Sequence, residues 1–143
     1  MKGGKCHYRA YSGVGVGATH KGAGTEKYNY GITKRGSRYL VLQTGKLYDR
    51  SAAVLYGARK GDKVWVTISH SEGKNWASCG HKSATNSPTT LTSKAYQHSS
   101  SDVQGHYMRA CAKTDGKVWC ATNGNKANRK HSDNKKRYWW TDS

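Results

Sequence analysis

Four cysteines and seven histidines are the residues of this 143-residue chain whose types could carry chemistry. Two of the cysteines, Cys111 and Cys120, are the first and last residues of the stretch CAKTDGKVWC. Its central Asp115-Gly116 predicts a two-residue hairpin turn, because a type I′ turn needs positive φ at both positions. Counting outward from that turn places Cys111 opposite Cys120 at a non-hydrogen-bonded pair, where opposed Cα atoms lie ~4.5 Å apart and a disulfide can form. The stretch therefore predicts a hairpin closed by a disulfide.

The two remaining cysteines, Cys6 and Cys79, pair by elimination. This second bridge would tie the N-terminal part of the chain to its middle, and closing so long a loop stabilises a fold by ~4 kcal/mol in the chain-entropy account. Two disulfides indicate an oxidising compartment, so we expect a secreted protein. Met1 is followed by Lys-Gly-Gly rather than by an apolar signal region, and we expect that a signal peptide has been removed.

A zinc site is the competing interpretation of the cysteines. Cys6-His7 and Cys79-Gly80-His81 together offer two thiols and two imidazoles. Structural zinc sites, however, usually contain Cys-x2-Cys pairs, which the chain lacks, and the same absence argues against thioredoxin-type redox chemistry. The disulfide interpretation is favoured, with neither metal nor cofactor expected.

The histidines leave one enzymatic alternative open. Two of them, acting as general base and general acid beside Lys or Arg, could cleave RNA without a metal in a basic secreted ribonuclease or toxin. The candidates flank the predicted central strands: His70, His81, His98 and His106. Their spacing selects no pair, the eight acidic residues are scattered, and neither a nucleophile elbow nor a P-loop occurs. We therefore favour a protein without a catalytic centre.

Charge is the most extreme property of the chain. Twenty-five Lys and Arg residues against eight Asp and Glu residues give a net charge of +17. Residues 1–60 hold twelve basic and two acidic side chains, residues 61–120 seven and four, and residues 121–143 six and two. Such an imbalance weakens the compact state but attracts anionic partners. The charge thus predicts a partner such as a cell-wall polymer, a membrane surface, an acidic subunit of a secreted complex or a nucleic acid.

Two regions supply candidate binding residues. Lys113 and Lys117 project beside the stapled hairpin turn. The basic aromatic tail, residues 126–143, adds cations and large rings that could stack on bases or sugars or lie at a membrane interface. An alternative for the same tail is a last strand that fills the core. The tail candidates are Lys135, Lys136, Arg137, Tyr138, Trp139 and Trp140.

The pattern of short strands predicts one all-β domain, a small barrel or sandwich, over residues 1–143, with a basic N-terminal part at 1–46. Val64, Val66 and Ile68 are expected to face the core, and Trp65 and Thr67 the other side. Residues 12–24 and 84–101 are expected to be irregular, and residues 49–56 are a candidate for one helical turn. The predicted strands are His7–Tyr11, Tyr28–Thr33, Tyr39–Thr44, Val54–Tyr56, Lys63–Ser69, Lys74–Ser78, Gln104–Lys113 and Lys117–Thr122.

The segment LYDRSAAVLYGARKGDKVWVTISHSEGKNWASCG, residues 47–80, resembles a bacterial SH3-type domain in its order of strands, Lys-Gly-Asp turn and Gly-x-x-Trp hairpin. The stretch HYMRACAKTDGKVWCAT resembles the closing hairpin of small secreted actinobacterial proteins with an Arg-Ala-Cys motif. The SH3-type resemblance implies a β-barrel that binds cell-wall peptides or glycans. The long basic N-terminal part and the disulfides depart from that family's pattern.

Overall fold

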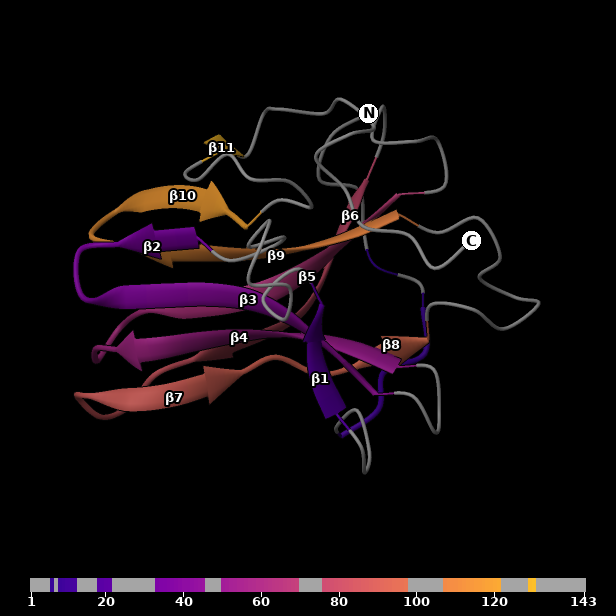
Figure 1. Cartoon of the computed structure of the whole chain (residues 1–143), viewed down its shortest axis with the longest axis horizontal. Coiled ribbons are helices and arrows are strands. Elements are labelled where there is room, and N and C mark those ends of the chain that lie inside the picture. Colours follow the sequence, from indigo (N-terminus) through magenta and orange to yellow (C-terminus); the bar gives the residue numbers. More distant parts are fainter. Residues whose placement is uncertain are drawn as a thin grey trace.

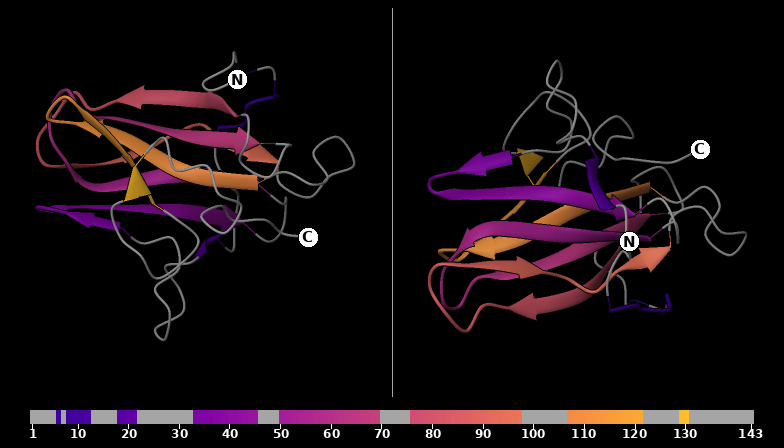
Figure 2. Two further views of the ribbon diagram at one scale, coloured as in Figure 1. Left: turned by 90° about the horizontal axis from the view of Figure 1, so that it is seen from above. Right: turned by 60° about the horizontal axis from the view of Figure 1, so that its bottom comes forward.

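The computed structural model of the chain describes residues 6, 8–12, 18–21, 33–45, 50–69, 76–97, 107–121 and 129–130. These residues form eleven short strands and no helix, in two antiparallel sheets that pack face to face (Figures 1 and 2). The predicted all-β barrel or sandwich is therefore confirmed. In the same residues there is no helix of the length and apolarity that crossing a membrane requires.

The first sheet is built on the paired strands β3 (Arg38–Gly45) and β4 (Arg50–Ala58). Two strands pair with β3, namely β1 (Ala18–Lys21) and β2 (Thr33–Arg35). Two others pair with β4, namely β7 (Thr89–Thr92) and β8 (Tyr96–Gln97). Because β4 has neighbours on both sides, its backbone groups are paired along most of its length.

The second sheet has β9 and β5 at its centre. Its order is β11 (Arg129–Lys130), β10 (Lys117–Cys120), β9 (Tyr107–Thr114), β5 (Lys63–Ser69) and β6 (Ala77–Ser83). The alternation along β5 is as predicted: Val64, Val66 and Ile68 face the core between the sheets, whereas Trp65 packs on the outer side. The same core contains Leu40, Leu42 and Leu55 from the first sheet and Met108, Ala110, Ala112 and Trp119 from the second.

Both predicted disulfides form. Cys111 and Cys120 are opposed across β9 and β10 with their Cα atoms 4.0 Å apart, and the turn between them has positive φ at Asp115 and Gly116. Cys6 is bonded to Cys79, so neither thiol remains to bind zinc. Two disulfides indicate an extracellular or otherwise oxidising environment.

Several local predictions are wrong. Residues 50–58 form a strand rather than the helical turn expected within 49–56, because pairing with β3 on one side and β7 and β8 on the other satisfies their backbone. The segments expected to be irregular contribute β1, β7 and β8, whose short sequences show no clear alternation. Of the predicted strand 7–11, the described residues make only an isolated bridge between Tyr11 and Ala95.

Candidate anion-binding surface

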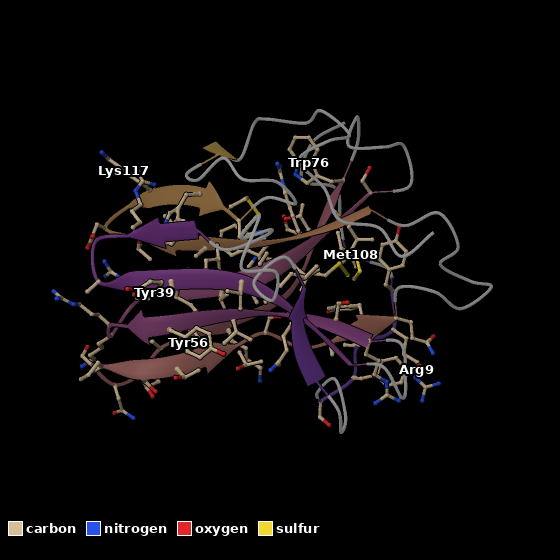
Figure 3. The ribbon with its side chains drawn as sticks, in the orientation of Figure 1. Arg9, Tyr39, Tyr56, Trp76, Met108 and Lys117 are labelled. Atoms are coloured by element: carbon tan, nitrogen blue, oxygen red, sulfur yellow. A yellow bond between two sulfur atoms is a disulfide. The ribbon has the colours of Figure 1, made fainter. Side chains whose placement is uncertain are left out.

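Four connections meet at one end of the sandwich, the end from which Lys117 projects in Figure 3. They are residues 36–37, 59–62, 84–88 and 115–116. Backbone hydrogen bonds join two of them, since Gly61 N donates to Ala84 O (2.9 Å) and Ala84 N donates to Asp62 O (2.8 Å). On or beside these connections lie seven cationic side chains, which we call the basic end: Arg35, Arg59, Lys60, Lys63, Lys82, Lys113 and Lys117.

Arg38, the eighth cation in this region, is buried and binds two carboxylates. Its Nε donates to Asp62 Oδ2 (2.6 Å) and its Nη2 to Asp62 Oδ1 (3.0 Å), in the bidentate geometry that suits a guanidinium and a carboxylate. Its Nη1 donates to Asp115 Oδ2 (3.1 Å) in the β9–β10 turn. Hydrogen bonds to Asp62 raise the pKa of Arg38 above its ordinary value, although burial alone would lower it. Arg38 therefore stays charged and joins three connections.

The acidic residues in the described part of the chain do not neutralise the basic end. Asp62 and Asp115 are the two acidic residues in the described part of the chain, and both bind Arg38. Six of the seven cations of the basic end are exposed, and Arg35 is half-buried with its guanidinium 5.7 Å from the centre of the Trp119 ring. Within the described residues none of the seven has a carboxylate partner. As far as the described residues go, the basic end thus presents positive charge to the solvent without a compensating carboxylate.

Two lysines of the basic end face each other across the second sheet. The register of β5 and β9 places Lys63 directly opposite Lys113, and that of β5 and β6 places Lys63 opposite Ser83. Lys113 is in turn opposite Val118 of β10. All four lie on the outer side of the sheet, because Val64, the next residue after Lys63, faces the core. A row of Ser83, Lys63, Lys113 and Val118 therefore crosses four strands.

A β-bulge brings an imidazole to the next row of the same face. Gly80 and His81 of β6 together lie opposite the single residue Trp65, between the pairs Val64–Lys82 and Val66–Cys79. A bulge re-aims the following side chain, and here Gly80 has the positive φ (73°) that glycine tolerates. The His81 ring stacks on Trp65 with centroids 5.0 Å apart and an interplanar angle of 27°.

The electrostatics of His81 connect it with the lysine row. Burial of one ring face, and then the positive charge of Lys63, lower the pKa of His81 from its ordinary value of 6.5. Both causes disfavour the imidazolium. His81 is therefore neutral at physiological pH, with one N–H as a donor and one nitrogen as an acceptor.

The scaffold beneath these side chains is closely packed. Trp65 is buried against the Cys111–Cys120 disulfide, and Thr67 Oγ1 lies 2.9 Å from Cys111 Sγ. The disulfide lies on the same face as Lys113, two residues along the strand, and joins β9 to β10 there. The hairpin predicted from its turn thus supports the lysine row.

The structure separates the two hairpin lysines that the sequence grouped. Lys113 pairs with Val118 and belongs to the outer row, whereas Lys117 pairs with Thr114, whose hydroxyl accepts a hydrogen bond from the buried Trp119 Nε1 (2.8 Å). Neighbouring pairs of an antiparallel ladder point to opposite faces. Lys113 and Lys117 are therefore both exposed but lie on opposite sides of the hairpin.

Most other candidates from the sequence lie outside the described residues. Of the four histidines considered for catalysis, the structure places His81, whereas His70, His98 and His106 are outside that part of the chain. The candidates of the tail are outside it too: Lys135, Lys136, Arg137, Tyr138, Trp139 and Trp140. Their roles stay predictions.

The far end of the molecule holds a different cluster of cations. Arg9 lies at the opposite end from Lys117 in Figure 3. The guanidinium carbons of Arg9 and Arg50 lie 5.2 Å and 3.7 Å from the centre of the Tyr11 ring. These two arginines are engaged in cation–π contacts. Because Arg9 is exposed and lies far from the basic end, replacing it removes the same unit charge as replacing a cation of the basic end and serves as a control.

No family model, curated protein or solved structure matches the chain. The resemblance of residues 47–80 to SH3-type domains accordingly stays a prediction from sequence motifs.

Proposed function

We propose that this protein is a secreted, non-enzymatic binding module that recognises an anionic polymer, with a phosphate-bearing cell-wall polymer as the first candidate. One observation carries the proposal: Asp62 and Asp115 both bind Arg38, while the seven cations of the basic end have no carboxylate partner among the described residues. Charges left uncompensated at one end of a fold attract anions and guide their approach. The two disulfides support a location outside the cell.

A polymer fits this surface better than a membrane does. Interfacial binding combines cations with an apolar face that enters the acyl chains. Among the described residues the exposed large hydrophobic side chains are Tyr39 and Val118. Tyr39 lies on the outer face of the first sheet and Val118 on the outer face of the second, because Leu40 and Trp119, the residues after them, face the core, so the two do not form one apolar face. The cations of the basic end come instead from several connections, which are spread over one end of the sandwich. That distribution suits successive charges along one polymer chain.

The test is retention of the purified protein on isolated cell walls. We expect retention that salt reverses, because contacts with a polyanion release counterions. Walls from which phosphate-bearing polymers have been stripped should retain much less protein than untreated walls. Equal retention on both would contradict a phosphate-bearing partner, and no retention on either would contradict a wall polymer altogether.

The same protein sample tests the ribonuclease alternative. Catalysis of that kind needs a general acid and a general base. Incubation of RNA with the wild-type protein or with the His81→Gln variant should leave the RNA intact. RNA cleavage that disappears in His81→Gln would overturn the non-enzymatic proposal.

A further inference from the structure

The lysine row places two like charges opposite each other, and no described residue of the row offsets them. Opposed residues of an antiparallel pair have their Cα atoms ~4.5–5.5 Å apart, and like charges at such positions are destabilising. Lys63 and Lys113 are opposed in this way, and both are exposed. Their described neighbours in the row, Ser83 and Val118, carry no negative charge. An anion between the two ammonium groups would turn this repulsion into attraction.

A third donor lies beside the pair. His81 is held by the bulge and by its stacking on Trp65, and it is close enough to Lys63 for that charge to disfavour the imidazolium. An ammonium group has three donors, and a neutral imidazole has one. Two lysines and one histidine on neighbouring rows of one face therefore match a tetrahedral oxyanion with several acceptor oxygens better than a planar carboxylate. Ser83, opposite Lys63, adds a hydroxyl donor at the edge of the row.

The rest of the basic end does not repeat this geometry. Arg59 and Lys60 are consecutive residues in one turn, and Lys117 lies on the other side of its hairpin from Lys113. The Lys63–Lys113 pair is distinguished by the closely packed residues beside its strands. The Cys111–Cys120 disulfide and the buried Trp65 lie in the next row of the same face.

We propose that Lys63, Lys113 and His81 form a discrete site for one phosphate group on the outer face of the second sheet. The proposal rests on the proposed function and deepens it, since it names the chemical group of the polymer and the residues that bind it. Lysine binds phosphate as a point charge, and two lysines on flexible stems can approach the same phosphate from both sides. The remaining cations of the basic end then act on neighbouring charges of the same polymer.

The site is tested with the full disulfide-bonded chain by NMR titration. Inorganic phosphate and dimethyl phosphate are added separately, against sodium chloride at equal ionic strength. We expect saturable shifts confined to the surroundings of Lys63, His81 and Lys113. Stronger binding of inorganic phosphate would identify a terminal phosphate as the natural ligand, and stronger binding of dimethyl phosphate would identify a diester within a backbone. Either result supports the site.

Matched variants decide whether the site is discrete. Removing one unit charge a few ångströms from a bound anion should weaken its binding about five-fold or more. Lys63→Met and Lys113→Met should therefore each lose that much affinity for the phosphate probe that the wild type prefers. Lys117→Met removes the same charge from the opposite side of the same hairpin and should change affinity less than about two-fold. Retained chemical-shift dispersion verifies that each variant is folded.

Two results would overturn the site. One is a linear, non-saturating response spread over all lysines, and the other is equal weakening by Lys113→Met and Lys117→Met. If walls still retain the protein in either case, the discrete site fails while the proposed function stands. If phosphate binds saturably but walls do not retain the protein, the proposed function fails alone.

Discussion

Arg38 and Asp62 form a buried, bidentate ion pair. It joins β3 of the first sheet to the connection that precedes β5 of the second sheet. Asp62 Oδ2 also accepts a hydrogen bond from Arg59 N (2.8 Å), and Asp62 N donates to Arg59 O (2.9 Å). The pair thus fixes the shape of one connection at the basic end. It also takes up a negative charge that would otherwise offset the exposed cations.

Replacing Arg38 by Met should destabilise the protein by about 3–5 kcal/mol, because it leaves the Asp62 carboxylate buried without its partner. Asp115→Asn removes the exposed partner of the same arginine and should cost less than about 1 kcal/mol. Chemical denaturation of the two variants measures the difference. A similar loss in both would show that the buried pair does not organise this end.

The two disulfides should contribute unequally to stability. They close loops whose ends are separated by 9 residues for Cys111–Cys120 and by 73 residues for Cys6–Cys79. In the chain-entropy account, removal should cost about 2.7 kcal/mol for the short loop and about 4.4 kcal/mol for the long one. Cys→Ala double variants compared by chemical denaturation test the order. A larger loss for Cys111→Ala/Cys120→Ala would show that packing around Trp65 outweighs loop entropy.

Gly80→Ala should disturb both the bulge and the position of His81. A Cβ at residue 80 would lie 2.9 Å from Tyr96 Cε1, in addition to the cost of a positive φ, which is about 1–2 kcal/mol. Gly116→Ala is the matched control, because its φ is also positive but a Cβ there meets no atom within 4 Å. Gly80→Ala should therefore lose more stability than Gly116→Ala and should shift the imidazole resonances of His81. Equal losses would mean that Tyr96 moves aside at little cost.

Lys63→Met should raise the pKa of His81, because it removes the positive charge that disfavours the imidazolium. Burial is the larger cause of the lowered pKa of His81 and is still present in the variant, so this pKa should stay below its ordinary value. NMR titration of the imidazole measures the change, with Lys117→Met as the control that should leave it almost unchanged. No change in Lys63→Met would place the Lys63 ammonium away from His81 and weaken the proposed phosphate site.

The same pKa sets the sign of a pH dependence. The unfolded chain binds a proton at His81 with its ordinary pKa of about 6.5, whereas the folded chain binds it only at lower pH. The contribution of His81 to stability is therefore fully present above the unfolded pKa. It is lost as the pH falls from there through the lowered folded pKa. In His81→Gln, the free energy of unfolding should depend less steeply on pH in that window.

Local turn chemistry explains which parts of the fold the sequence predicts. The Asp115-Gly116 turn determines the register of β9 and β10, and with it the Cys111–Cys120 bond, so this hairpin is predicted from ten residues. The core-facing alternation of β5 is equally local. The short strands β7 and β8 are missed because pairing with β4 creates them, and their own residues show no clear alternation.

The candidate site could be predicted only in part, because its residues meet through long-range pairing. Lys113 is recognised beside the turn, but its partner Lys63 is fifty positions earlier, and only the register of β5 and β9 brings them together. His81 is one of seven histidines until the bulge at Gly80 turns it onto Trp65. No sequence signal distinguishes Asp62 as the partner of Arg38 from the other acidic residues.

The most direct test of an anion-binding basic end is the salt dependence of wall binding in two charge-matched double variants. Lys60→Met/Lys117→Met removes two cations from the basic end, and Arg9→Met/Lys94→Met removes two exposed cations that do not belong to it. If the basic end binds the polymer, the slope of log affinity against log salt should become less steep in Lys60→Met/Lys117→Met, by up to about 0.7–0.9 for each phosphate that this variant no longer neutralises. The slope of Arg9→Met/Lys94→Met should hardly change. Equal slopes in the two variants would show that net charge alone attracts the partner and would contradict a basic binding end.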